Sequence, residues 1–153
     1  MKTTLFSFAL VSLLGHAAAA EVRLADCPPA VQATIQQNSR DGRLDEIESY
    51  SIQGKALYVA EVELAGDRDL KIHVAADGAL VKTREDATLA EVPEAVRKAV
   101  EGKLNGGVAD DVDKETAGST VTYHVEIDRK GAPDTNLTLD SAGKILSESE
   151  EHD

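Results

Sequence analysis

The sequence has no tryptophan, one methionine, two phenylalanines and three tyrosines among 153 residues. A core of large aromatic side chains is therefore excluded, and valine, isoleucine, leucine and alanine must supply most of it. The single cysteine, Cys27, excludes an internal disulfide, although an exported protein would permit one. We interpret Cys27 as a small apolar side chain at the start of a helix, and a disulfide to a second chain is the alternative.

Basic residues are also scarce, with 16 Lys and Arg against 28 Asp and Glu and a formal charge of −12. A surface with this charge repels nucleic acid and anionic lipid and favours cations or basic proteins as partners. We therefore expect no nucleic acid partner and a protein partner with a basic surface.

Long apolar runs are confined to the N-terminus. Lys2 precedes an uncharged apolar stretch over 5–14, and three alanines at 18–20 supply the small residues of a cleavage site. This order predicts a signal peptide over 1–20, cleaved before Glu21. No later segment is long enough to span a bilayer, so we expect a periplasmic or secreted protein without a membrane anchor. The mature chain would carry a charge of −13, because the segment contains one basic and no acidic residue.

Motifs for catalysis are missing as well. The chain has no glycine-rich phosphate loop, no HExxH and no Cys/His zinc spacing. After the signal peptide, the histidines are His73, His124 and His152. We interpret His73 and His124 as solvated strand residues, and we expect no catalytic residue, no cofactor and no enzymatic activity.

An internal repeat organises the remaining chain. A shift of 65 residues aligns 28–88 with 93–153 without a gap and keeps turn glycines and apolar positions in register. Each copy begins with an apolar stripe at helical spacing, after Pro28 and Pro93. Strands with alternating side chains follow at 56–64 and 121–128, then third strands with apolar residues inside, and short closing strands around Leu80 and Ile145.

These patterns predict an α+β fold of two tandem repeats, each a helix followed by an antiparallel β-meander, with the helices packed on one face of the sheet. The predicted boundaries are 21–88 for the first repeat and 89–153 for the second, which ends in an acidic C-terminal tail. Because clean alternation is typical of a sheet covered on one side, we expect the helices to cover the face of Tyr58 and Tyr123.

The opposite face is predicted to be open to solvent and to bind the partner. The candidate partner-binding residues on it are Glu61, Glu63, His73, His124, Glu126 and Asp128. This predicted face carries no tryptophan, tyrosine or phenylalanine.

Two acidic clusters leave open, as the alternative function, a periplasmic protein that binds or senses a divalent cation, either calcium or a transition metal. They are Asp110-Asp111-x-Asp113 and the tail from Glu148 to Asp153, with the hard oxygen ligands that Ca²⁺ prefers. Neither has the twelve-residue EF-hand spacing. We prefer a solvated loop for the first cluster and a disordered end for the second, and we assign no metal ligands.

The helix segment VPEAVRKAVEGKL and the strand segment TYHVEIDRKGAPDTNLTLDSAGKILSESEE resemble a PepSY-like repeat. The matching features are the proline before the helix, the Tyr-x-Val-Glu strand at 123–126 and the hairpin at 140–144. The resemblance covers most of the mature chain as two copies and implies an exported, non-catalytic domain. Related domains include inhibitory propeptides of thermolysin-type proteases and the β-lactamase-inhibitor-protein fold. Such inhibitors bury aromatic anchors, so the predicted open face does not favour β-lactamase inhibition.

Overall fold

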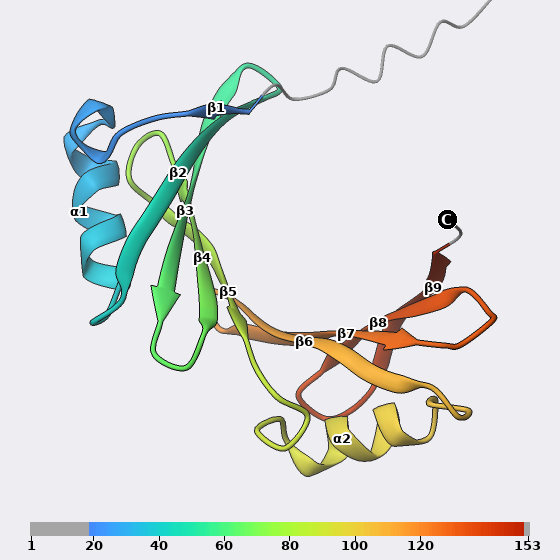
Figure 1. Cartoon of the computed structure of the whole chain (residues 1–153). Helices are drawn as coiled ribbons and strands as arrows, with labels where there is room; N and C mark the ends of the chain where they lie inside the picture. The colour runs from blue at the N-terminus through green and yellow to red at the C-terminus, as the bar shows by residue number, and fades with distance from the viewer. Residues whose placement is uncertain (1–18, 152–153) are drawn as a thin grey trace, which may run out of the picture.

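The computed structural model describes residues 19–151, which form one nine-stranded antiparallel sheet with strands β1 to β9 in chain order (Figure 1). The strands are β1 (Ala20–Glu21), β2 (Arg43–Ile52), β3 (Lys55–Leu64), β4 (Arg68–Ala75), β5 (Leu80–Asp86), β6 (Val108–Ala117), β7 (Thr120–Asp128), β8 (Asp134–Asp140) and β9 (Ile145–Glu151). The helices are α1 (Pro29–Asn38) and α2 (Glu94–Glu101), and a 3₁₀ turn, η1, spans Leu24–Asp26. Almost all of the predicted signal peptide lies outside the described residues.

The predicted fold class of two tandem helix-plus-meander repeats is wrong. Strands dominate the fold, and the two helices contain only ten and eight residues. β5 pairs with β6 from Thr83↔Thr116 to Asp86↔Asp113, and this pairing joins every strand into a single sheet. The backbone groups at that seam are satisfied by the ladder, so neither half keeps a free edge there.

Two long strands were missed in the sequence, and both begin with an interruption of the alternation. The register of β2 shifts between Leu44 and Glu46, and that of β6 shifts between Ala109 and Val112. A β-bulge adds a residue and moves the next side chain to the other face, so the apolar period is lost. Residues 110–113 lie in β6, so the expectation of a solvated loop there is wrong. The acidic tail forms β9 as far as Glu151, so the expectation of a disordered end is wrong for the residues up to Glu151.

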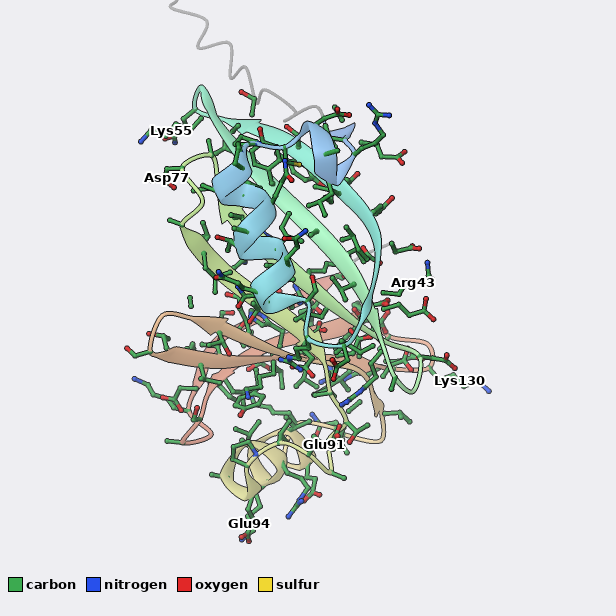
Figure 2. All side chains as sticks on the ribbon, turned by 90° about the vertical axis from the view of Figure 1, so that its left-hand side faces the viewer. Arg43, Lys55, Asp77, Glu91, Glu94 and Lys130 are labelled. Atoms are coloured by element: carbon green, nitrogen blue, oxygen red, sulfur yellow. The ribbon has the colours of Figure 1, made fainter. Side chains whose placement is uncertain are left out.

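Both helices lie on the convex side of the strongly curved sheet (Figure 1). In Figure 2, α1 lies in front of the strands of the N-terminal half, and α2 lies at the bottom of the view. Val31 and Ile35 of α1 are buried against Ile47, Val62 and Ile72, among others. Val96 and Val100 of α2 are buried in a second cluster with strand residues including Val125, Ile127, Leu137 and Leu139. The inward positions predicted for the third strands, from Leu70 to Val74 and from Thr135 to Leu139, are buried.

Two turn glycines allow each helix to approach the sheet closely. Gly78 has φ +87°, and a Cβ there would lie 2.6 Å from Ala30 Cβ of α1. Gly143 has φ +81°, and a Cβ there would lie 2.4 Å from the carbonyl oxygen of Ala95 in α2. Glycine satisfies both the left-handed backbone and the lack of space. The Thr34 hydroxyl adds a hydrogen bond of 2.6 Å to the Gly78 carbonyl oxygen.

Cys27 lies between η1 and α1 and is 4% exposed. Its thiol is 3.5 Å from the carbonyl oxygen of Arg23, and burial raises its pKa, with a further contribution from Asp26. A thiol with a raised pKa is a poor nucleophile at neutral pH. No helix within residues 19–151 is long and apolar enough to cross a membrane.

Candidate binding face

In the part of the chain that the structure describes, no helix lies on the concave side of the sheet (Figure 1). The strand pairing sets the side chains of this side in rows across neighbouring strands. The strand registers place one row from β2 to β6 through Glu46, Glu61, Lys71, Arg84 and Glu115. A second row runs from β5 to β8 through Asp86, Asp113, His124 and Thr138. The face is therefore polar in its centre and combines both signs of charge.

Two cations of β5, in the centre of this face, are each paired with a carboxylate of β6. Lys82 Nζ lies 2.9 Å from Glu115 Oε2, and Arg84 Nη2 lies 2.5 Å from Asp113 Oδ2. These two pairs join β5 to β6 across the seam. Because their side chains are only partly exposed, they contribute more than typical surface pairs and fix the relative position of the two halves.

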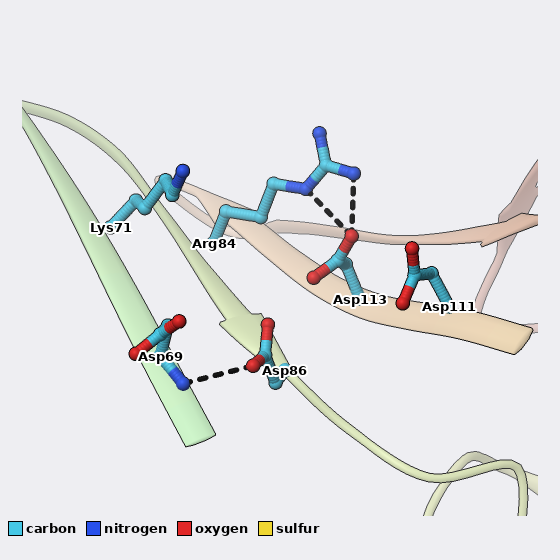
Figure 3. A pocket seen from close by; sticks show the side chains of 6 residues that line it. All are labelled: Asp69, Lys71, Arg84, Asp86, Asp111 and Asp113. Atoms are coloured by element: carbon cyan, nitrogen blue, oxygen red, sulfur yellow. Dashed lines mark hydrogen bonds and ion pairs between the residues drawn. The ribbon is translucent and has the colours of Figure 1, made fainter. Parts of the chain in front are cut away.

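A cleft of about 320 Å³ lies beside these pairs (Figure 3). Lys71 and Arg84 border it together with four aspartates, Asp69, Asp86, Asp111 and Asp113. The Asp69 backbone N–H donates to Asp86 Oδ2 at 2.9 Å. Burial and the neighbouring Asp113 and Asp69 nevertheless raise the pKa of Asp86, because carboxylates of like charge disfavour ionisation.

The two histidines flank the Lys82–Glu115 pair rather than standing in solvent. His124 Nδ1 lies 3.3 Å from the Thr138 hydroxyl, and His124 Nε2 lies 3.7 Å from Glu115 Oε2. Burial, followed by the charge of Arg84, lowers the pKa of His124 despite Glu115 and Asp113. Burial, followed by Lys82, also lowers the pKa of His73. Both histidines are half-buried, so the interpretation of these residues as fully solvated is wrong.

The residues predicted to bind a partner lie on the concave face or its margins, but they do not form one cluster. Glu61 is 3.3 Å from Lys71 Nζ, and Glu63 is paired with Arg43 at the far end of β3. Glu126 lies on β7 on the other side of the seam, and Asp128 ends that strand. The seam and its ion pairs separate the two groups.

Carboxylates gather at the two ends of the face, and Glu46 and Glu126 there take part in no ion pair with another residue in 19–151. At the N-terminal end, burial and then Glu48, Glu61, Glu21 and Asp45 raise the pKa of Glu46. At the C-terminal end, burial and then Asp111, Asp134, Glu151 and Asp110 raise the pKa of Glu126. The neighbouring carboxylates add negative potential at both ends of the face, which a bound cationic group would relieve.

An apolar groove of about 300 Å³ adjoins the N-terminal acidic end. Its apolar lining is Tyr50, Ile52, Leu57 and Val59. The Tyr50 hydroxyl donates to Glu48, and Ile52 is 48% exposed. The expectation that the open face has no aromatic residue is therefore wrong. Tyr50 was missed because β2 was not predicted, although Glu46-x-Glu48-x-Tyr50-x-Ile52 alternates around buried Ile47.

Within residues 19–151, no group of three or more His, Cys, Asp or Glu side chains is arranged to hold a metal ion. Asp86 and Asp113 of the cleft are register partners across β5 and β6, and Asp113 is already paired with Arg84. The described residues therefore offer no site for the divalent cation considered as an alternative ligand.

Solved structures from three Bacteroides species share this fold. A DUF2874 family protein from Bacteroides uniformis has a TM-score of 0.66 at 21% identity, covering 81% of this chain and 89% of that one. A protein provisionally assigned to the periplasm of Bacteroides eggerthii has a TM-score of 0.68 at 20% identity, and the match covers 81% of this chain and 88% of that one. A BLIP-like protein from Bacteroides fragilis has 0.63 at 20%, with 81% and 86% covered. No family model and no curated protein matches the chain.

At these identities the likeness establishes the fold, which is BLIP-like. The β-lactamase-inhibitor-protein-like part of the predicted resemblance is thereby confirmed at the level of fold. Membership of a PepSY-like family stays a prediction from the sequence. The function has to be argued from the concave face itself, because one fold supports many functions.

Proposed function

We propose that this protein is an exported, non-enzymatic binding module that uses the concave face of its sheet to bind a protein with a basic surface. The observation that carries the proposal is the uncovered face. Within residues 19–151, helices lie on one side only of the nine-stranded sheet, and the other side combines paired charges in the centre with carboxylates that take part in no ion pair at both ends.

The shape and the charge of this face both favour a macromolecular partner. A concave surface several strands wide can contact a protruding segment from two sides, and it offers both a polar cleft and an apolar groove. Electrostatic attraction accelerates association and selects the sign of the partner. The predicted signal peptide and the resemblance to a Bacteroides protein provisionally assigned to the periplasm support an extracytoplasmic location.

Charge reversal provides the test. Glu46→Lys and Glu126→Lys replace carboxylates that pair with no cation in the described part of the chain. They are better choices than Glu61 or Glu63, which pair with Lys71 and Arg43. Glu101→Lys on α2 makes the same change of charge on the convex side and is the matched control. The mature protein would be immobilised and used to capture proteins from an envelope extract at several salt concentrations.

The double variant is expected to lose captured protein by about tenfold at 0.15 M salt, where charges within about 8 Å still interact. Glu101→Lys should capture as much as the unchanged protein. Equal capture by all three proteins would contradict the proposal, and so would a loss caused by Glu101→Lys alone.

A further inference from the structure

The groove on the N-terminal half of the concave face changes from apolar to acidic along the strands. β2 and β3 pair Tyr50 with Leu57 at one end, and Glu46 with Glu61 at the other. Glu48 and Val59 form the pair between them. Residues two apart on a strand are about 7 Å apart, so the acidic pair lies about 13 Å from the aromatic ring of the groove.

The acidic end is short of cations. Glu46 and Glu48 take part in no ion pair with a residue in 19–151, and Lys71 is the single cation that lines the groove. Lys71 itself contacts Glu61. The apolar end exposes Ile52 and holds Tyr50 in place through its hydroxyl bond to Glu48.

We propose that this groove binds an extended segment of the partner protein that presents one large apolar side chain and a Lys or Arg two and four residues away from it. The proposal rests on the function proposed above and specifies the sequence that the face recognises. An extended segment repeats about every 7 Å on one side, which is the spacing of the three side-chain pairs beneath it. The apolar side chain then covers Tyr50, and the cations reach Glu48 and Glu46.

Charge complementarity selects this occupant over the others. A second copy of this chain would bring a charge of −12 to an acidic groove and is disfavoured. An acidic peptide is disfavoured for the same reason. A purely apolar segment would leave the carboxylates unpaired beside it, which costs binding free energy.

The test uses labelled peptides and fluorescence anisotropy with the mature protein. The probe is Gly-Ser-Leu-Thr-Lys-Thr-Lys-Ser-Gly, with the reverse sequence as a second probe because the chain direction is free. One control peptide replaces Leu with Gly, and another replaces both Lys with Glu. The protein variants are Tyr50→Ser and Glu46→Gln with Glu48→Gln, and Val108→Ser is the matched control at an apolar side chain that is 66% exposed on β6.

At least one probe is expected to bind, and both control peptides should bind about tenfold more weakly or not at all. Tyr50→Ser should weaken binding of the probe peptide by about tenfold. In the variant with Glu46→Gln and Glu48→Gln, binding of the probe should lose most of its dependence on salt concentration. Val108→Ser should leave binding within twofold. Circular dichroism and urea unfolding would establish that each variant is folded.

Failure of the probes, or equal binding by the Tyr50→Ser and Val108→Ser variants, would overturn the groove. The function proposed above would still stand if capture from envelope extract depended on Glu46 and Glu126. Loss of both dependences would overturn both proposals.

Discussion

Replacing Gly143 by alanine should destabilise the fold by more than the cost of placing alanine in a left-handed backbone conformation. Gly143 follows β8 in the turn that lies against α2, at φ +81°. Alanine in the left-handed region costs about 1 kcal/mol. Its Cβ would also lie 2.4 Å from the Ala95 carbonyl oxygen and 2.7 Å from the Ala95 carbonyl carbon. Both are backbone atoms of α2, so the helix itself has to move.

Forced displacement of packed elements typically costs about 1–3 kcal/mol. The expected total for Gly143→Ala is therefore about 2–4 kcal/mol of unfolding free energy. Gly131 provides the matched control, because it has φ +77° and no atom lies within 4 Å of a Cβ built there. Gly131→Ala carries the backbone cost and the same change in the unfolded chain, so the difference between the two variants isolates the contact with α2.

Urea unfolding followed by circular dichroism measures this difference. With an m value of about 2 kcal/mol/M, the midpoint of Gly143→Ala should lie about 0.5–1.5 M below that of Gly131→Ala. Unchanged m values would show that both variants keep the same compactness. Midpoints equal within error would refute the inference that glycine is required for the close approach of α2.

Three further predictions concern the core and the charges. Ile72→Ala, at a fully buried site, should lower the free energy of unfolding in urea by about 2–5 kcal/mol. Ile52→Ala, on the open face, should lower it by less than about 0.5 kcal/mol. Equal losses would contradict the assignment of the two residues to opposite faces of the sheet. The lowered pKa of His124 means that the unfolded state binds more protons than the folded state near pH 6. The free energy of unfolding should therefore fall from pH 7.5 to 5.5, and it should fall less in His124→Gln. An identical dependence of the unfolding free energy on pH in both proteins would exclude this contribution. Glu85 accepts two hydrogen bonds from Arg40, at 2.9 and 2.8 Å, and this contact is the main cause of its lowered pKa. Glu85→Gln should therefore lower the free energy of unfolding by up to about 1 kcal/mol at pH 7 and leave it unchanged once the pH falls well below 4.5. A loss that persists in acid would point to packing instead.

The parts of the fold that follow strict alternation could be predicted from the sequence. Leu70, Ile72 and Val74 alternate without interruption, and each is buried on the helix side. Bulges hide the periodicity of β2 and β6, and acidic residues have a low strand propensity. The union of all strands into one sheet depends on the β5–β6 pairing, a contact between segments separated by α2 that no local pattern specifies.

The candidate site was predictable only in part for the same reason. Alternation placed Glu61, His73 and Glu126 on the open side, but it could not show which carboxylates already have cations. The pairing of Lys71 with Glu61, and of Arg43 with Glu63, depends on strand register. Tyr50 and its groove became visible only with β2, since the groove is formed by side chains from three strands.

Site-specific photo-crosslinking in the native cell envelope tests the central claim most directly. A photoreactive amino acid would be placed at Val59 and Thr138 on the concave face, and at Gln36 and Glu101 on the exposed sides of α1 and α2. If the concave face binds the partner, the first two positions will give a discrete adduct with one basic protein and the two helix positions will not. Adducts formed from the helices alone, or from none of the four positions, would contradict the account.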